Sequence, residues 1–269
     1  MSFITFLTDF GLEDDFVGTC HGVMKRIAPD VQIIDITHGI PPRQVLPGAL
    51  TLANTLPYMP VGVHLAVVDP GVGSARRALA LRDGAGRIHV GPDNGLLVPA
   101  AEKLGGIKEA HELTNPAYAL ESVSRTFHGR DLFAPAAAHL ALGVPLAELG
   151  PPIDPDALAR LDLPQPEVGS SRIRCKVISI DRFGNMQLNI DRSHLDQTEI
   201  VPGQRLELEL GPERYYVVAA RTFADARPGD IILYEDAYRN VAIAISGGNA
   251  AEMLGVHEGQ DLRIHLEAS

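Results

Sequence analysis

The spacing of apolar residues changes once along this chain, and the change divides it in two. The first 145 residues alternate apolar or β-branched runs with segments of helical spacing, which is typical of a sheet covered by helices. Six prolines then fall between residues 145 and 169. From Arg172 the period is mostly two, in short runs separated by turn residues. We therefore expect an α/β domain over residues 1–165 with a mostly parallel sheet, and a small all-β domain, either a barrel or a sandwich, over residues 172–269.

The same patterns predict individual elements. In the first part we expect strands at 3–7, 31–36 and 63–68, a hairpin of 78–82 with 87–90, and helices at 14–28, 43–56, 94–104 and 132–142. In the second part we expect short strands at 173–180, 186–190, 205–210, 215–220, 231–234, 241–245 and 262–266.

Net charge, cysteine content and the N-terminal residues limit the classes of partner and the cellular compartment that we expect. The formal net charge is −11, which argues against nucleic acid or an anionic membrane because phosphate binding needs a basic surface. Cys20 and Cys175 lie far apart and form no CxxC motif, so we expect two reduced cysteines. The N-terminal residues lack the basic region of a signal peptide, and we expect a cytoplasmic protein.

A carboxylate and an arginine flank a tight turn after the apolar run 63–68. Asp69 is followed by Pro70 and Gly71, and Arg76 returns seven residues later. Ligand chemistry in open α/β folds gathers at this end of a buried strand. The pair is either functional or a structural ion pair that pins the turn.

A second compact motif, TFHGRD, spans residues 126–131 and contains His128. With Asp69 and Arg76 this histidine completes a set able to orient and activate a water molecule. The alternative is a histidine at a helix start that bonds only to backbone.

Two further groups are candidates for ligand binding. Asp9 closes the first predicted strand, where a carboxylate can accept both hydroxyls of a ribose or can serve as a turn or capping residue. Asp181, Phe183 and Asn185 lie between two predicted strands. An asparagine suits an adenine edge or an amino-acid group and a phenylalanine can stack on a purine, but the same residues also suit a turn.

The chain lacks the usual phosphate-binding glycine motifs and any histidine pair at metal-ligand spacing. We therefore expect no metal ion, although the first domain contains many acidic residues and also His38.

Taken together, these residues resemble the S-adenosyl-L-methionine hydroxide adenosyltransferase family, relatives of the fluorinase and chlorinase enzymes. The matching segments run in order along nearly the whole chain: LTDFG (7–11) with DFVG (15–18), DITH (35–38), VDPGVG (68–73), GPDNG (91–95), TFHGRD (126–131), FGN (183–185) and GNA (248–250).

The resemblance implies an N-terminal α/β domain, a C-terminal β-barrel, and a homotrimer with sites between neighbouring subunits. It implies a catalytic set of Asp69, Arg76 and His128, a ribose contact by Asp9, and adenine or methionine contacts by the turn that holds Asp181, Phe183 and Asn185. The halogenases are expected to replace the aspartate and to lack the histidine, so the full set favours water over halide as the nucleophile.

The activity implied is hydrolysis of S-adenosyl-L-methionine, as substrate and without a further cofactor, to adenosine and L-methionine. His128 is favoured as the base with Asp69 orienting it, although the two roles can be exchanged; Arg76 stays protonated. The alternatives are a halide adenosyltransferase, a non-catalytic sensor of adenosine or its methionine conjugate, and a metal-dependent phosphoesterase.

Overall fold

The chain divides after Leu161 into two units, and each unit has its own hydrophobic core. The computed structural model describes residues 3–266. Within that range no helix is long and apolar enough to cross a membrane.

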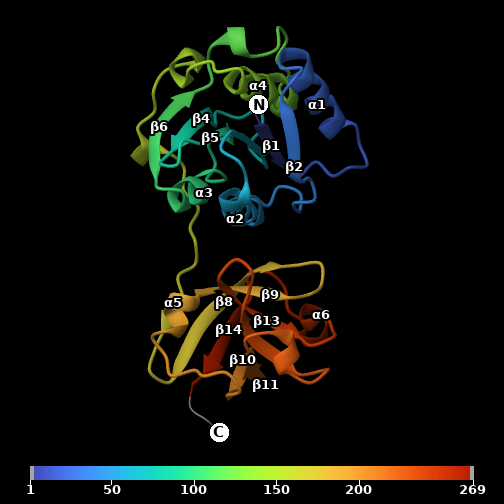
Figure 1. Cartoon of the computed structure of the whole chain (residues 1–269), viewed down its shortest axis with the longest axis vertical. Helices are drawn as coiled ribbons and strands as arrows, with labels where there is room; N and C mark the ends of the chain where they lie inside the picture. Colours follow the sequence, from blue (N-terminus) through green and yellow to red (C-terminus); the bar gives the residue numbers. More distant parts are fainter. Residues whose placement is uncertain (1–2, 267–269) are drawn as a thin grey trace. The chain divides into compact units, whose positions relative to one another are not determined.

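The first unit is a six-stranded sheet covered by helices on both faces (Figure 1). The strands run in the order β2–β1–β3–β5–β4–β6. They are β1 (Phe3–Thr8), β2 (Gln32–Thr37), β3 (Val63–Val67), β4 (Ala78–Asp83), β5 (Ile88–Pro92) and β6 (Ile107–Glu112). The main helices are α1 (Phe16–Ile27), α2 (Val45–Thr55), α3 (Val98–Lys103) and α4 (Ala134–Ala141).

Side-chain alternation along the strands assigns each helix pair to one face of the sheet. Phe6 faces α1 and α4, whereas Leu7 faces α2 and α3. Helix α1 buries Val17, Cys20 and Met24, which recur at helical spacing, and it ends just before Pro29. The central strand β3 is buried along its whole length, as a strand covered on both faces must be.

The prediction of a mostly parallel sheet is wrong, because the sheet is mixed. Strands β2, β1, β3 and β5 are parallel, but β4 runs antiparallel to β5 and to β6. The hairpin of β4 and β5 was expected, whereas β6 was not. The β6 sequence, IKEAHE, carries charged residues of types that are depleted in strands. The strand lies at the edge of the sheet, where it is less enclosed by other strands and can carry such residues.

The second unit is a barrel, as predicted. Seven strands close in the order β14–β10–β11–β12–β13–β9–β8, with β8 pairing back to β14, and β7 adds to the edge of β8. They are β8 (Arg172–Ile180), β9 (Met186–Asp191), β10 (Arg205–Leu210), β11 (Glu213–Ala219), β12 (Ile231–Glu235), β13 (Asn240–Ile245) and β14 (Asp261–His265), with β7 at Glu167–Val168. The short helices α5 (Arg192–Leu195) and α6 (Ala250–Leu254) complete it (Figure 1).

Alternate residues of the barrel strands fill its interior. In β8 the inward residues are Ile173, Cys175 and Val177, which is the period of two seen in the sequence. Burial raises the pKa of the Cys175 thiol, which keeps it protonated and inert.

Candidate active site

Asp69 and Arg76 are ion-paired across the turn that links β3 to β4. The Arg76 Nε lies 3.1 Å from Oδ1 and 3.0 Å from Oδ2 of Asp69, and Nη2 also donates to Oδ2. The side chains are only 6% (Asp69) and 11% (Arg76) exposed, so solvent screens the pair weakly. The guanidinium also lies over the buried ring of Phe133, 5.1 Å from its centroid.

His128 joins this pair through the same guanidinium. The Arg76 Nη2 lies 2.9 Å from the His128 Nδ1. Arg76 therefore stands between the carboxylate and the imidazole and bonds to both. The structure thus brings together all three residues of the predicted catalytic set, although they come from separate segments of the chain.

The contact with Arg76 fixes the protonation of the imidazole. A guanidinium can only donate, so the Nδ1 of His128 accepts and the proton of the neutral ring sits on Nε2. Burial lowers the pKa of His128, and the charge of Arg76 lowers it further, against a smaller opposite effect of Asp69. The neutral Nε2–H form is therefore the resting state near neutral pH.

Two glycines let the neighbouring loops close on this set. Gly73 has a φ of +78°, and a Cβ there would lie 2.4 Å from the carbonyl oxygen of Arg125. Gly129 follows His128 directly, and a Cβ there would lie 2.9 Å from the ring of Phe10. Both contacts need the absence of a side chain, which explains the glycines in the two motifs.

Asp131 holds the segment that carries His128, and the sequence argument gave it no role. It is fully buried, and its carboxylate accepts from the Ser124 amide at 2.8 Å and from Arg130 at 2.6 Å. It belongs to a short π-helical turn, Gly129–Phe133, that leads into α4. Its place in the TFHGRD motif was the available signal, but only the structure shows that the carboxylate points inward to the loop.

Asp9 lies at the same sheet edge. It follows β1, which pairs in parallel with β3, and the last registered pair, Thr8 with Val67, brings Asp9 and Asp69 to the ends of adjacent strands. The Asp9 Oδ2 accepts from the Arg43 amide at 2.7 Å. The Asp9 carboxylate lies where a ligand-binding carboxylate is expected. Its hydrogen bond to the Arg43 amide also connects the end of β1 to the loop before α2.

Asp181, Phe183 and Asn185 form one turn between β8 and β9. The Asp181 Oδ1 accepts from the amides of Phe183 (2.8 Å) and Asn185 (2.9 Å), and its Oδ2 accepts from the Asn185 Nδ2 at 2.7 Å. The Asp181 side chain is thus used inside the turn, as the turn alternative expected. The Phe183 ring is 68% exposed and presents a flat apolar surface to solvent.

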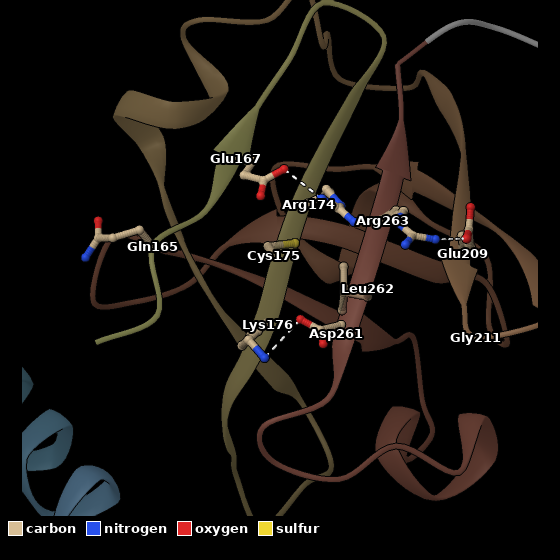
Figure 2. A pocket seen from close by; sticks show the side chains of 10 residues that line it. All are labelled: Gln165, Glu167, Arg174, Cys175, Lys176, Glu209, Gly211, Asp261, Leu262 and Arg263. Carbon is tan, nitrogen blue, oxygen red and sulfur yellow. Dashed lines mark hydrogen bonds and ion pairs between the residues drawn. The ribbon is translucent and has the colours of Figure 1, made fainter. Parts of the chain in front are cut away.

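A pocket on the barrel contains none of the predicted site residues. Figure 2 shows its lining, which comes from the chain before β7, from β7, β8, β10 and β14, and from the turn that follows β10. Its charged side chains pair with one another, as Glu167 with Arg174 at 3.0 Å, Lys176 with Asp261 at 3.0 Å, and Arg263 with Glu209 (Figure 2). We assign no ligand to it.

The edge that carries Asp69, Arg76 and His128 therefore holds a carboxylate acceptor, a fixed cation and a neutral imidazole in one linked group. Such a set can orient a water molecule and accept its proton without a metal ion.

Comparison with known proteins identifies the family of the chain. Residues 4–150 match the model of the SAM hydroxide adenosyltransferase N-terminal domain, and residues 175–263 match that of the C-terminal domain. The chain is 48% identical to a protein of Salinispora tropica named (R)-S-adenosyl-L-methionine hydrolase, over 97% of both chains. It is 34% identical to a fluorinase of Actinoplanes sp., over 90% of both chains. The crystal structure of a protein from Thermotoga maritima superposes with a TM-score of 0.91 at 34% identity and covers 97% of this chain and 99% of that one. The chain belongs to the SAM hydroxide adenosyltransferase family.

Proposed function

We propose that this protein hydrolyses S-adenosyl-L-methionine to adenosine and L-methionine, with Asp69, Arg76 and His128 as the catalytic set. The observation that carries the proposal is the shared guanidinium, which binds both the carboxylate and the imidazole in a nearly buried position. Membership of the family and the names of the relatives support the choice of substrate.

The reaction needs activation on only one side. Water attacks C5′ of the ribose, the new C–O bond forms as the C5′–S bond breaks, and the electron pair stays on sulfur. The sulfonium becomes a neutral thioether, so the leaving group requires no acid. The remaining task is to take a proton from water, whose pKa is about 15.7 in bulk.

The geometry supports the exchanged roles, with Asp69 as the proton acceptor. Protonating His128 at Nδ1 would break its bond to Arg76 and place two cations 2.9 Å apart. A carboxylate offers about four lone-pair sites, and the three donor contacts from Arg76 leave room for a water O–H. We assign His128 the task of donating through Nε2–H to the attacking oxygen as it is positioned.

Substrate binding uses the other predicted residues. Asp9 lies at the adjacent strand end, and we assign it the ribose hydroxyls. Phe183 offers an exposed ring on which adenine can stack, and hydrogen bonds to the Asp181 carboxylate hold the backbone of the turn that carries it. Assembly as a homotrimer belongs to the same proposal, and light scattering on the purified protein tests it.

The proposal extends to the configuration at sulfur. The sulfonium carries three different groups and is a stereocentre, and the name of the Salinispora tropica relative specifies the R form. We propose the same epimer as the preferred substrate here.

The test is to incubate the purified protein with each epimer, with and without chloride, and to identify products by mass spectrometry. The proposal predicts adenosine and methionine, faster from the R epimer, at a rate that chloride does not redirect. Formation of 5′-chloro-5′-deoxyadenosine would instead favour the halide adenosyltransferase, and unchanged substrate would favour a sensor.

A further inference from the structure

Two imidazoles and one carboxylate converge at a place the proposed chemistry does not use. His21 lies on α1, Asp35 lies in β2, and His38 follows β2 directly. The Nε2 of His21 is 2.9 Å from the Asp35 Oδ1, and the Nε2 of His38 is 3.2 Å from the same oxygen. The three potential ligand atoms all lie within 4.8 Å of one another. A helix and a strand thus present three donors to one point.

The second observation is the Nε2 of His38. His38 is only 4% exposed, and within the described residues its Nε2 makes no hydrogen bond of good geometry; its near neighbour is the Asp35 Oδ1, at an ion-pair distance of 3.2 Å. A buried nitrogen left in this way destabilises the fold unless something else engages it. It points into the cluster, where a cation would accept its lone pair.

The other nitrogen of His38 is held as a metal ligand requires. Its Nδ1 lies 2.8 Å from the Thr8 Oγ1, which also accepts from the Phe10 amide at 3.1 Å. An Nδ1–H donating to Thr8 leaves the Nε2 lone pair free and fixes the ring plane, as the outer partners of metal-bound histidines do.

The surroundings also suit an ion. The buried ring of Phe6 packs against both imidazoles, with centroid distances of 5.8 Å to His21 and 4.9 Å to His38. The opposite side is open, since the His21 side chain is 32% exposed and that of Asp35 is 41% exposed. The cluster therefore has an apolar wall on one side and an entry path on the other.

The donor set selects the kind of cation. Ca²⁺ and Mg²⁺ prefer oxygen ligands, whereas imidazole with one carboxylate suits Zn²⁺ and its first-row neighbours. Two ligands bound to one tetrahedral Zn²⁺ at about 2.0–2.1 Å are about 3.3 Å apart. The separations of 2.9 and 3.2 Å from the imidazoles to Asp35 are close to that value, and the two imidazole nitrogens, which lie within 4.8 Å of one another, would both turn toward the ion.

We propose that His21, Asp35 and His38 bind one Zn²⁺ ion, with water in the fourth position. The ion ties α1 to the end of β2. Through the hydrogen bond of His38 it also steadies Thr8, the residue that precedes Asp9, without contacting the predicted catalytic set. The proposal is independent of the reaction assigned to the protein.

The experiment is a calorimetric Zn²⁺ titration of the full chain after treatment with a chelator, together with the visible spectrum on adding Co²⁺. We expect one ion per chain and an absorption band typical of four-coordinate Co²⁺. His21→Ala and Asp35→Asn change partly exposed side chains, and each should weaken Zn²⁺ binding at least about tenfold, as loss of even an outer partner does. Thr8→Val should also weaken it, by about 10–100-fold.

His257→Ala is the matched control, because His257 is an exposed histidine outside the cluster and should leave binding unchanged. Circular dichroism confirms that each variant is folded. Absence of saturable binding, or binding that His21→Ala and Asp35→Asn leave intact, overturns the proposal.

Discussion

The Nη2 of Arg76 lies 2.9 Å from the Nδ1 of His128, and this contact decides which nitrogen of the ring carries a proton. Because Arg76 also binds Asp69, the imidazole and the carboxylate are linked through the cation and not directly. The account of catalysis follows from that order of residues.

The first prediction separates a donor from a base at position 128. His128→Asn keeps an acceptor for Arg76, whereas His128→Ala removes it. A hydrogen bond to a charged group contributes about 1.5–3 kcal/mol, so the Asn variant should be about tenfold or more faster than the Ala variant. Steady-state kcat for both measures this; equally slow variants would mean that the imidazole itself takes the proton.

The second prediction concerns the shared cation. Arg76→Lys keeps the charge but cannot hold the carboxylate and the imidazole in one planar fork, so kcat should fall at least about tenfold. Arg82→Lys is the control, since Arg82 lies in β4 and pairs with the half-exposed Glu109. A kcat of Arg76→Lys equal to that of the control would contradict the assignment.

The third prediction tests the close approach of two loops. Gly73→Ala places a methyl group 2.4 Å from the Arg125 carbonyl at a φ of +78°, so it should lower both kcat and Tm. Gly86→Ala has a similar φ of +85° with nothing within 4 Å of the new methyl group, so it carries the backbone strain alone. Its strain costs about 1–3 kcal/mol of stability, and its kcat should not change. The two variants must differ in kcat if the loop contact matters.

The fourth prediction is a loss of stability in acid that depends on His64. This histidine is fully buried, and burial lowers its pKa to about 3. The unfolded chain binds the proton below about pH 6.5 and the folded chain does not, so stability is full above that pH and declines as pH falls toward 3. The contribution is on the order of a few kcal/mol.

His64→Asn keeps an acceptor for the Thr5 hydroxyl and removes this titration. Urea unfolding at several pH values between 7 and 4 should therefore show a shallower decline for the variant than for the wild type. His257→Ala should follow the wild type, because that side chain is exposed. Parallel curves for all three proteins would refute the prediction.

The fifth prediction places adenine on Phe183. Phe183→Ala should raise KM about 5–150-fold, because stacking of a base on an aromatic ring contributes about 1–3 kcal/mol. Tm should be unchanged, since the ring is 68% exposed. Tyr216→Ala, another exposed ring on the barrel, should leave KM as it is; an unchanged KM in both variants would remove Phe183 from the binding site.

Much of this fold could be predicted from spacing alone. Helix α1 and strands such as β3 and β8 bury regular apolar faces, and both their period and their turn residues are visible in the sequence. The edge strand β6 was missed because its sequence is rich in charged residues, and the sheet is mixed because β4 runs antiparallel to both β5 and β6.

The site could be predicted in its residues but not in its order. The strand ends and turns indicated Asp69, Arg76 and His128, yet no spacing shows that the arginine lies between the other two. In the proposed mechanism this order favours Asp69 over His128 as the proton acceptor. Asp131 was missed for a similar reason, because only the folded loop shows where a buried carboxylate points.

Hydrolysis in water enriched in ¹⁸O tests the central claim most directly. The purified protein is given (R)-S-adenosyl-L-methionine, and the adenosine formed is analysed by mass spectrometry. Attack of solvent on C5′ predicts one ¹⁸O atom per adenosine, at the 5′-hydroxyl, with an equal amount of unlabelled methionine. Unlabelled adenosine, label in the methionine, or a product other than adenosine would contradict the mechanism.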